Sequence, residues 1–255
     1  MSSRSFLVTA RAYKMEVRLY DDRTLEKPKF HHPGNMTIYG PSKSGKTRFL
    51  MRLIRFRREL FQFSPHAGGH EFKKVYYFFG VWQEAFAEMQ KEYGDYIVFY
   101  DGFPSGDISQ LVKETPALVI LDDLENEVTS HDEAKNLLSK YSHHKDYYVC
   151  MVFQALFGKG GSNAVRLREQ MDVQVFLKFM NEETGLKKRF SNFVDSSGAL
   201  KIFLETYKKW VAEKGGYLVA DFHPDQSPSQ ALQRFRTRIF PDDGYSLVLR
   251  IRGDA

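Results

Sequence analysis

The sequence predicts an α/β fold in which a central, mostly parallel sheet is flanked by helices. Short β-rich runs alternate with amphipathic segments along most of the chain. Strands that alternate with helices form parallel sheets, because parallel neighbours require crossover connections. The chain has 255 residues, of which 42% are hydrophobic, so it can bury a sizeable core within one large domain.

The strand pattern begins after Pro33 and continues to residue 179. Each expected strand is bounded by Gly, Pro, Asp or Ser. The six expected strands cover residues 36–39, 75–79, 96–100, 117–121, 147–153 and 173–179. Apolar residues recur at three- and four-residue spacing between the first strands, which predicts helices over 49–61 and 82–93.

The rest of the chain is less regular. A helix is expected over 200–214, followed by strands near 217–222 and 245–251 that extend the same domain. Residues 1–32 are polar and mixed. The expected organisation is therefore an N-terminal extension at 1–32 and a single domain at 33–255.

Composition restricts the partners and the cellular location. The formal charge of +5 leans toward a polyanionic partner without establishing one. The single cysteine, Cys150, lies in an apolar run and is expected to be a buried core residue. No apolar run approaches the roughly 20 residues that span a bilayer, and Phe6-Leu7-Val8 is too short for a signal peptide. We therefore expect a soluble, intracellular protein with no membrane partner.

Residues 40–47 form a glycine-rich loop that follows every position of the pattern G-x-x-x-x-G-K-[ST]. An expected strand enters this loop and an expected helix leaves it, which is the context that the pattern requires. Glycines let the backbone curl so that successive N–H groups point into one concavity, and this nest favours phosphate oxygens. The loop therefore predicts a P-loop ATPase domain that binds ATP with Mg²⁺.

The loop residues have separate expected roles. The Lys46 ammonium would contact the β- and γ-phosphates, and the Thr47 hydroxyl would ligate Mg²⁺. The nucleotide-binding set is Gly40, Pro41, Ser42, Lys43, Ser44, Gly45, Lys46 and Thr47.

An apolar strand that ends in two acids supplies the carboxylates that such a loop needs. Five apolar residues precede Asp122 and Asp123, which indicates a strand buried on both faces. Open α/β folds bind ligands at the carboxyl edge of the sheet. We expect Asp122 to hold the metal and Asp123 to orient the attacking water, with Glu125 as the alternative for that role. Alternatively, these acids cap the following helix. The expected fold is a RecA/ASCE-like P-loop NTPase.

Other polar residues lie where catalysis could use them. Gln154 ends the strand 147–153 and could contact the γ-phosphate or the lytic water. Arg166 and Arg168 precede the next strand, and one of them could serve as an arginine finger from a neighbouring subunit.

Three basic features could contact nucleic acid. Arg48, Arg52 and Arg55, with Arg58 nearby, share one face of the helix after the loop, and residues 187–189 form a short basic run. Arg234, Arg236 and Arg238 alternate, so an extended strand would present them together. Phosphate contacts need only clustered Lys and Arg, so sequence does not choose among these features.

These elements, taken in order, resemble the poxvirus-type genome-packaging ATPases of double-stranded DNA viruses, within the FtsK–HerA superfamily; similar proteins occur in virus-like transposons. The resemblance covers about residues 34–250 and depends on the elements' order. In sequence order, the elements that carry the resemblance are 40–47, 118–123, Val152-Phe153-Gln154-Ala155-Leu156-Phe157, Arg166-Leu167-Arg168, 173–179 and the segment from Arg234 to Pro241.

The resemblance implies a motor that translocates double-stranded DNA. It implies a homo-oligomeric ring with ATP between subunits, capsid or portal partners, and a location in the host cell or assembling virion. The Gln154 strand would lie between the loop strand and the Asp122 strand. Lys46 and Thr47 would bind nucleotide, Asp122 magnesium, and Gln154 would be the sensor. The trans finger would be Arg166 or Arg168. Asp123 departs from the superfamily, which usually has glutamate there.

Two other classes of function use the same loop. One is a helicase-like enzyme or a nucleotide kinase, which would need an acceptor pocket. The other is a nucleotide-gated interaction module in which ATP only switches shape. The acids Asp122 and Asp123 together with Gln154 favour hydrolysis over binding alone.

Overall fold

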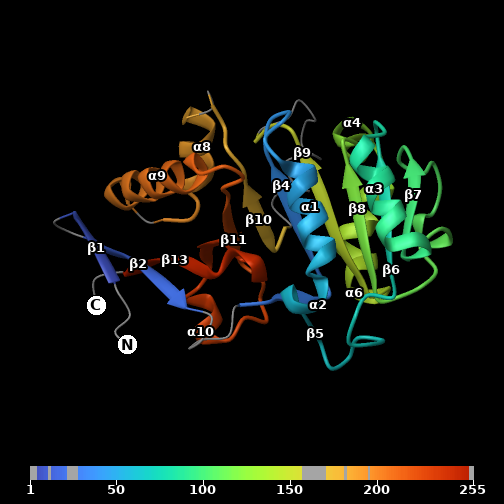
Figure 1. The fold of residues 1–255 in the computed structure, drawn as a ribbon, viewed down its shortest axis with the longest axis horizontal. Helices are drawn as coiled ribbons and strands as arrows, with labels where there is room; N and C mark the ends of the chain where they lie inside the picture. Colours follow the sequence, from blue (N-terminus) through green and yellow to red (C-terminus); the bar gives the residue numbers. More distant parts are fainter. Residues whose placement is uncertain are drawn as a thin grey trace.

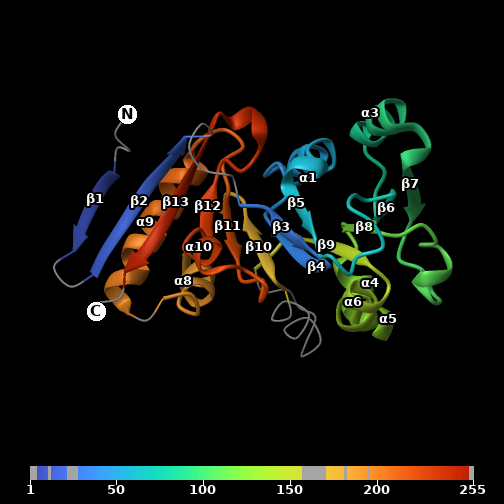
Figure 2. The same ribbon diagram turned by 90° about the horizontal axis from the view of Figure 1, so that it is seen from below.

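The computed structural model contains one large sheet whose two halves differ in strand direction (Figures 1 and 2). It describes residues 5–10, 13–21, 28–156, 171–180, 183–194 and 196–252. Within these residues the sheet has eleven strands in the order β1-β2-β13-β12-β11-β10-β4-β9-β8-β6-β7.

The parallel half runs from β10 to β7, and all neighbouring strands in it point the same way. Its strands correspond to the six predicted ones. β9 lies between β4 and β8, the order that the resemblance implies. The bounds are β4 Gly34–Tyr39, β6 Lys74–Phe79, β7 Ile97–Asp101, β8 Ala117–Asp122, β9 Tyr147–Phe153 and β10 Val173–Phe176.

The antiparallel half continues from β10 through β11, β12, β13, β2 and β1. Two of its strands, β1 and β2, come from the segment 1–32, which was predicted as an N-terminal extension. Met15, Val17 and Leu19 alternate with charged residues in β2, which is the pattern of a half-buried strand. The bounds are β1 Ser5–Ala10, β2 Tyr13–Asp21, β11 Leu218–Asp221, β12 Phe235–Thr237 and β13 Tyr245–Arg252.

Helices cover both faces of the sheet. Figure 2 shows α1 and α3 on one side of the parallel half and α4, α5 and α6 on the other. The longer helices are α1 Lys46–Arg55, α3 Glu84–Tyr93, α8 Glu183–Phe190 and α9 Ser197–Ala212. The short ones are α2 Arg57–Leu60, α4 Glu125–Ser130, α5 Asp132–Asn136, α6 Ser142–His144 and α10 Pro228–Ala231.

Smaller elements complete the described chain. A π-helical turn, Leu137–Tyr141, joins α5 to α6, and β3 Phe30–His32 pairs in parallel with β5 Phe61–Phe63. Single 3₁₀ turns cover Gly94–Tyr96, Ile108–Gln110 and Pro241–Asp243. None of the described helices combines the length and hydrophobicity needed to cross a membrane.

Two hydrophobic cores form, one on each face, because side chains of a strand alternate between faces. In β9, Val149 and Met151 join the core under α4, α5, α8 and α9. Between them, Cys150 packs into the core under α1 and α3, where it is fully buried as expected. Side chains at the ends of the strands lie outside both cores, so polar residues can occupy these positions.

Three predicted elements end earlier or start later than the sequence pattern indicates. The helix predicted over 49–61 divides at Phe56, whose φ of −100° and ψ of 23° end α1 before the chain turns into α2 and β5. The helix predicted from residue 82 begins at Glu84, which leaves Trp82 outside it. The strand predicted to reach residue 179 ends at Phe176, because its neighbour β4 ends at Tyr39.

Candidate nucleotide-binding site

The glycine-rich loop occupies residues 40–45, between the end of β4 and the start of α1. Gly45 has φ +102°, a left-handed conformation that glycine adopts at little cost, and it is the N-cap residue of α1. A Cβ at Gly40 would lie 2.4 Å from the Ser44 hydroxyl oxygen and 3.1 Å from Leu177 Cβ, so any larger residue there would have to displace these side chains. The Gly40 N–H donates to the carbonyl of Phe153 at 3.1 Å, which ties the loop to the end of β9.

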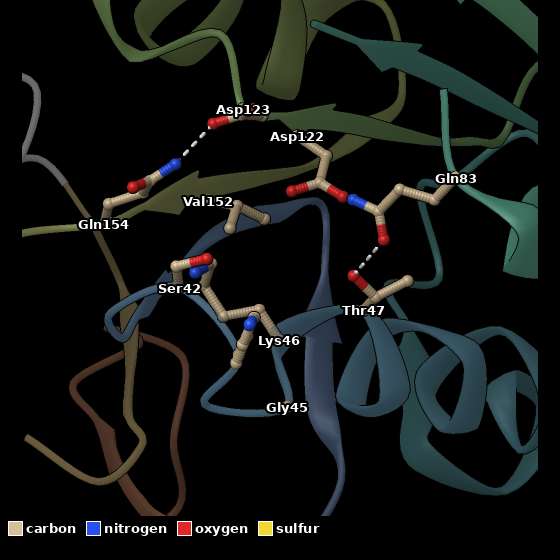
Figure 3. A pocket seen from close by; sticks show the side chains of 10 residues that line it. Ser42, Gly45, Lys46, Thr47, Gln83, Asp122, Asp123, Val152 and Gln154 are labelled. Carbon is tan, nitrogen blue, oxygen red and sulfur yellow. Dashed lines mark hydrogen bonds between the residues drawn. The ribbon is translucent and has the colours of Figure 1, made fainter. Parts of the chain in front are cut away.

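A cavity of ≈ 370 Å³ opens between this loop and the carboxyl ends of β8 and β9 (Figure 3). The predicted residues Lys46, Thr47, Asp122, Asp123 and Gln154 all line it. The full lining is Ser42, Lys43, Gly45, Lys46, Thr47, Gln83, Asp122, Asp123, Val152 and Gln154. Two further loop residues, Pro41 and Ser44, line a second cavity of ≈ 290 Å³ beside the loop.

The Lys46 side chain folds back over the loop. Its ammonium donates to the carbonyls of Gly40 at 2.7 Å and Pro41 at 2.9 Å. Burial lowers the pKa of Lys46, while the nearby carboxylates of Asp122 and Asp123 act in the opposite direction. The loop backbone thus holds the Lys46 ammonium through two of its own carbonyl oxygens.

Asp122 is the last residue of β8 and is 3% exposed. The Tyr77 hydroxyl donates to its Oδ2 at 2.7 Å. Burial raises the pKa of Asp122, and the hydrogen bond from Tyr77 and the charge of Lys46 oppose that rise. The site therefore contains a buried carboxylate whose hydrogen-bonding neighbour is a neutral hydroxyl. The sequence did not indicate a role for Tyr77 at this site, because Tyr77 lies in the middle of the apolar strand β6.

Thr47 faces the same cavity from the first turn of α1. Its hydroxyl donates to the side-chain carbonyl Oε1 of Gln83 at 3.0 Å. Figure 3 shows the Gln83 side chain between Thr47 and Asp122. Gln83 is a second residue that sequence reasoning missed, because no local motif marks a glutamine just before a helix as part of a site.

Asp123 and Gln154 contact each other across the mouth of the cavity. The Gln154 amide Nε2 donates to Asp123 Oδ1 at 2.6 Å, and the Gln154 backbone N–H donates to Glu125 Oε2 at 3.3 Å. Asp123 has φ +58°, and a Cβ at Gly80 would lie 2.2 Å from its carbonyl oxygen. The backbone thus turns sharply just after β8, and the absence of a side chain at Gly80 leaves space for the Asp123 carbonyl oxygen.

The candidate finger residues Arg166 and Arg168 lie outside the described residues. The sequence expectation for them therefore stays a prediction.

Arg234, Arg236 and Arg238 are not presented together by one strand, contrary to the sequence interpretation, because only Arg236 lies in β12. Arg236 is fully buried and its guanidinium donates to Asp221 at 2.7 Å. Arg238 has φ +56° and pairs with Glu213 at 2.6 Å. The strand covers three residues only, so the period-two pattern does not extend over all three arginines.

The other basic features are partly used within the fold. Arg52 pairs with Asp242 and Asp243, and Arg189 is buried and donates to Gln174. On α1, Arg48 and Arg55 are exposed. This helix therefore keeps basic charge at the surface beside the loop.

Oxygen atoms at the cavity suit a hard divalent cation. The Thr47 hydroxyl and the Asp122 carboxylate are both of the ligand type that Mg²⁺ prefers. The strand–loop–helix unit, the acidic end of β8 and the strand order β10-β4-β9-β8-β6 together define a P-loop NTPase fold of the RecA/ASCE-like kind.

Similar solved structures belong to ATPases and related proteins, at low identity. The genome packaging NTPase B204 from Sulfolobus turreted icosahedral virus 2, in complex with ATP-gammaS, is 13% identical with a TM-score of 0.47, covering 74% of this chain and 93% of that chain. The flagellar accessory protein FlaH from Methanocaldococcus jannaschii is 12% identical with a TM-score of 0.38, covering 59% and 75%. The ATPase DotB from Legionella pneumophila is 12% identical with a TM-score of 0.35, covering 80% and 77%.

No protein-family model matches the chain, and no curated protein matches its sequence. At TM-scores below 0.5, the structural likenesses carry no residue role or activity over to this chain.

Proposed function

We propose that the protein is a Mg²⁺-dependent ATPase that drives DNA translocation, as in the packaging of a viral or virus-like genome. One observation carries the ATPase part: Lys46, Thr47, Asp122, Asp123 and Gln154, from three separate elements, line a single cavity. Lys46 neutralises the phosphates, and Thr47 and Asp122 hold Mg²⁺, which supplies charge neutralisation at the phosphate oxygens.

In this function, Asp123 and Gln154 orient the attacking water. Their side chains are hydrogen-bonded to each other, so the two can orient one water between them and the phosphates. Glu125 is the alternative carboxylate, and it contacts the backbone rather than the side chain of Gln154. This contact pattern favours Asp123.

DNA translocation is supported by the resemblance of the motifs to packaging ATPases and by the formal charge of +5. Exposed Arg48 and Arg55 are candidate phosphate contacts. A ring with a trans finger from Arg166 or Arg168 belongs to the same proposal, as do capsid or portal partners. Mass measurement in solution, with an ATP analogue and DNA present, tests the ring; a monomer under all conditions would contradict it.

The decisive test is steady-state ATP hydrolysis with and without double-stranded DNA. We expect DNA to stimulate turnover, and Lys46→Ala to reduce it by at least ~100-fold, because a preorganised charge at the phosphates is lost. Lys91→Ala, which removes an exposed lysine of α3 outside the cavity, is the matched control. Asp123→Ala should reduce turnover more than Glu125→Ala.

The remaining outcomes separate the competing functions. Hydrolysis that is indifferent to DNA would contradict translocation and leave the ATPase. Nucleotide binding without detectable hydrolysis in the unmodified protein would indicate a nucleotide-gated interaction module. Transfer of phosphate to a small acceptor would indicate a kinase.

A further inference from the structure

The second cavity beside the glycine-rich loop differs from the first in the character of its lining. The residues that line the first cavity are polar or charged, except for Gly45 and Val152. Met180 lines the second cavity and is 75% exposed, so its side chain is accessible to a ligand. The apolar residues in the lining of this second cavity, whose volume is ≈ 290 Å³, are Pro41, Met180, Val211 and Ala212.

The two cavities lie on opposite sides of the loop. The first adjoins the carboxyl ends of β8 and β9, whereas the second adjoins the segment after β10 and the end of α9. In the sheet, β4, which leads into the loop, lies between β9 and β10. Ser42 and Lys43 line both cavities. One elongated ligand that passes along these two residues can therefore occupy both cavities.

Contacts within the fold hold the walls of the second cavity in place. On one side, the Tyr207 hydroxyl of α9 donates to the Leu177 carbonyl at 2.6 Å and accepts from the Phe179 N–H at 3.3 Å. These two bonds fix the segment that follows β10. On the other side, the chain turns so tightly after α9 that a Cβ at Gly216 would lie 2.1 Å from the Trp210 carbonyl oxygen. The cavity is therefore built into the fold.

The charges around the second cavity favour an anionic ligand. Lys43, Lys178 and Lys214 line the cavity and are exposed. The one acid in its lining, Glu213, is paired with Arg238 at 2.6 Å. Sites for small ligands combine apolar surface with a few polar groups that fix orientation. Cations beside an apolar surface suit a ligand in which a flat apolar group is joined to phosphates, and a nucleotide has this composition.

We propose that the second cavity binds the base and ribose of the nucleotide whose phosphates lie in the first. This inference rests on the proposed function, which directs the terminal phosphate toward Asp123 and Gln154. A phosphate chain held by the loop with that end at β8 and β9 places its other end on the β10 side. There the base packs against Met180 and Val211, and Lys214 donates to oxygens of the ribose or the nearest phosphate.

The experiment compares ADP with pyrophosphate, which carries the same two phosphates without a nucleoside. Isothermal titration calorimetry measures both affinities in the unmodified chain and in Ala212→Trp. Ala212 is exposed and is the last residue of α9, so a larger side chain there occupies the cavity without entering a core. The unmodified chain should bind ADP more tightly than pyrophosphate. Ala212→Trp should weaken ADP binding by about 10–100-fold and leave pyrophosphate binding unchanged.

Two further variants separate the effect of the cavity from a general effect of the substitution. Ala87→Trp is the matched control, because Ala87 is exposed on α3 and lines neither cavity. It should change neither affinity. Met180→Ser removes apolar surface without adding bulk, so it should weaken the binding of ADP and not that of pyrophosphate.

Unchanged ADP affinity in both Ala212→Trp and Met180→Ser would overturn the inference, and so would equal losses for ADP and pyrophosphate. If Ala212→Trp kept its ADP affinity but lost the stimulation of hydrolysis by DNA, the cavity would belong to a DNA-binding surface instead. An unmodified protein that binds neither ADP nor pyrophosphate is a different result, because it would contradict the proposed function itself.

Discussion

The two halves of the sheet each end a strand in a buried aspartate, and the two aspartates differ in their partners. In the antiparallel half, Asp221 ends β11, is 1% exposed and faces the guanidinium of Arg236 at 2.7 Å. In the parallel half, Asp122 ends β8, is 3% exposed and accepts a hydrogen bond from the neutral Tyr77 hydroxyl. Burial alone does not distinguish a structural carboxylate from a functional one. The direct partner differs: Asp221 is paired with a guanidinium, whereas Asp122 accepts from a neutral hydroxyl and, in the proposed function, is left to bind the metal.

Replacing Asp122 gives the largest expected effect and tests the functional side of the comparison. Burial raises the pKa of Asp122, so its ionised form costs stability that is absent at low pH and grows as the pH rises through the pKa in the folded state. Asp122→Asn removes that cost. We expect ATP hydrolysis to fall by at least ~100-fold, because Mg²⁺ loses a carboxylate ligand, with no loss of stability in urea unfolding at pH 7.

The matched control for Asp122→Asn is Asp101→Asn, at the exposed end of β7, a parallel strand separated from β8 by β6. It should change neither hydrolysis nor stability appreciably. Clear destabilisation by Asp122→Asn would show that this carboxylate is structural, as Asp221 is.

Replacing Arg236 tests whether the buried Arg236–Asp221 ion pair stabilises the fold. Arg236→Met leaves Asp221 buried without its cation, and breaking a buried ion pair in this way costs about 3–5 kcal/mol of unfolding free energy. Urea unfolding measures the loss, and hydrolysis by the folded fraction should be unchanged. Arg238→Met is the control in the same segment: its partly exposed pair with Glu213 should contribute at most about 1 kcal/mol. Equal losses in the two variants would contradict the distinction.

A third buried polar residue, His32, sharpens the comparison at the opposite edge of the parallel half. Its ring lies 2.9 Å from Asp146, which precedes β9, and burial lowers the pKa of His32 from 6.5 to about 4. The unfolded chain therefore binds a proton that the folded chain does not between these two values. Stability should fall as the pH is lowered from 7, by about 2 kcal/mol at pH 5.

Urea unfolding at several pH values measures this effect. His32→Gln should flatten the dependence of stability on pH between pH 5 and 7. An unchanged slope in His32→Gln would assign the acid sensitivity to other groups.

Local patterns allowed most of the parallel half to be predicted from sequence. Buried parallel strands are continuous apolar runs, and the glycine loop has a pattern of its own. That is why residues 40–47, Asp122, Asp123 and Gln154 could be assigned to one edge before their distances were known. Strand order came only through the resemblance, because alternation alone does not decide which strands are neighbours.

The rest depended on contacts between residues distant in sequence. Tyr77 contacts Asp122 only because β6 lies beside β8, and Gln83 reaches the cavity through its contact with Thr47, which is 36 positions away in the sequence. The burial of Arg236 follows from its partner Asp221, fifteen positions earlier and on an adjacent strand. In β2 the alternating pattern was present, but its charged residues gave it the composition of an extension.

The pairing of β2 with β13 has a consequence for the order of folding. Residues 14–21 align with residues 245–252, so β2 can pair with β13 only after the strands that lie between them in the sequence have been synthesised. The strands of the parallel half pair with one another and need neither β2 nor β13. During translation, the parallel half can therefore assemble first, while β2 keeps an unpaired edge until β13 is available.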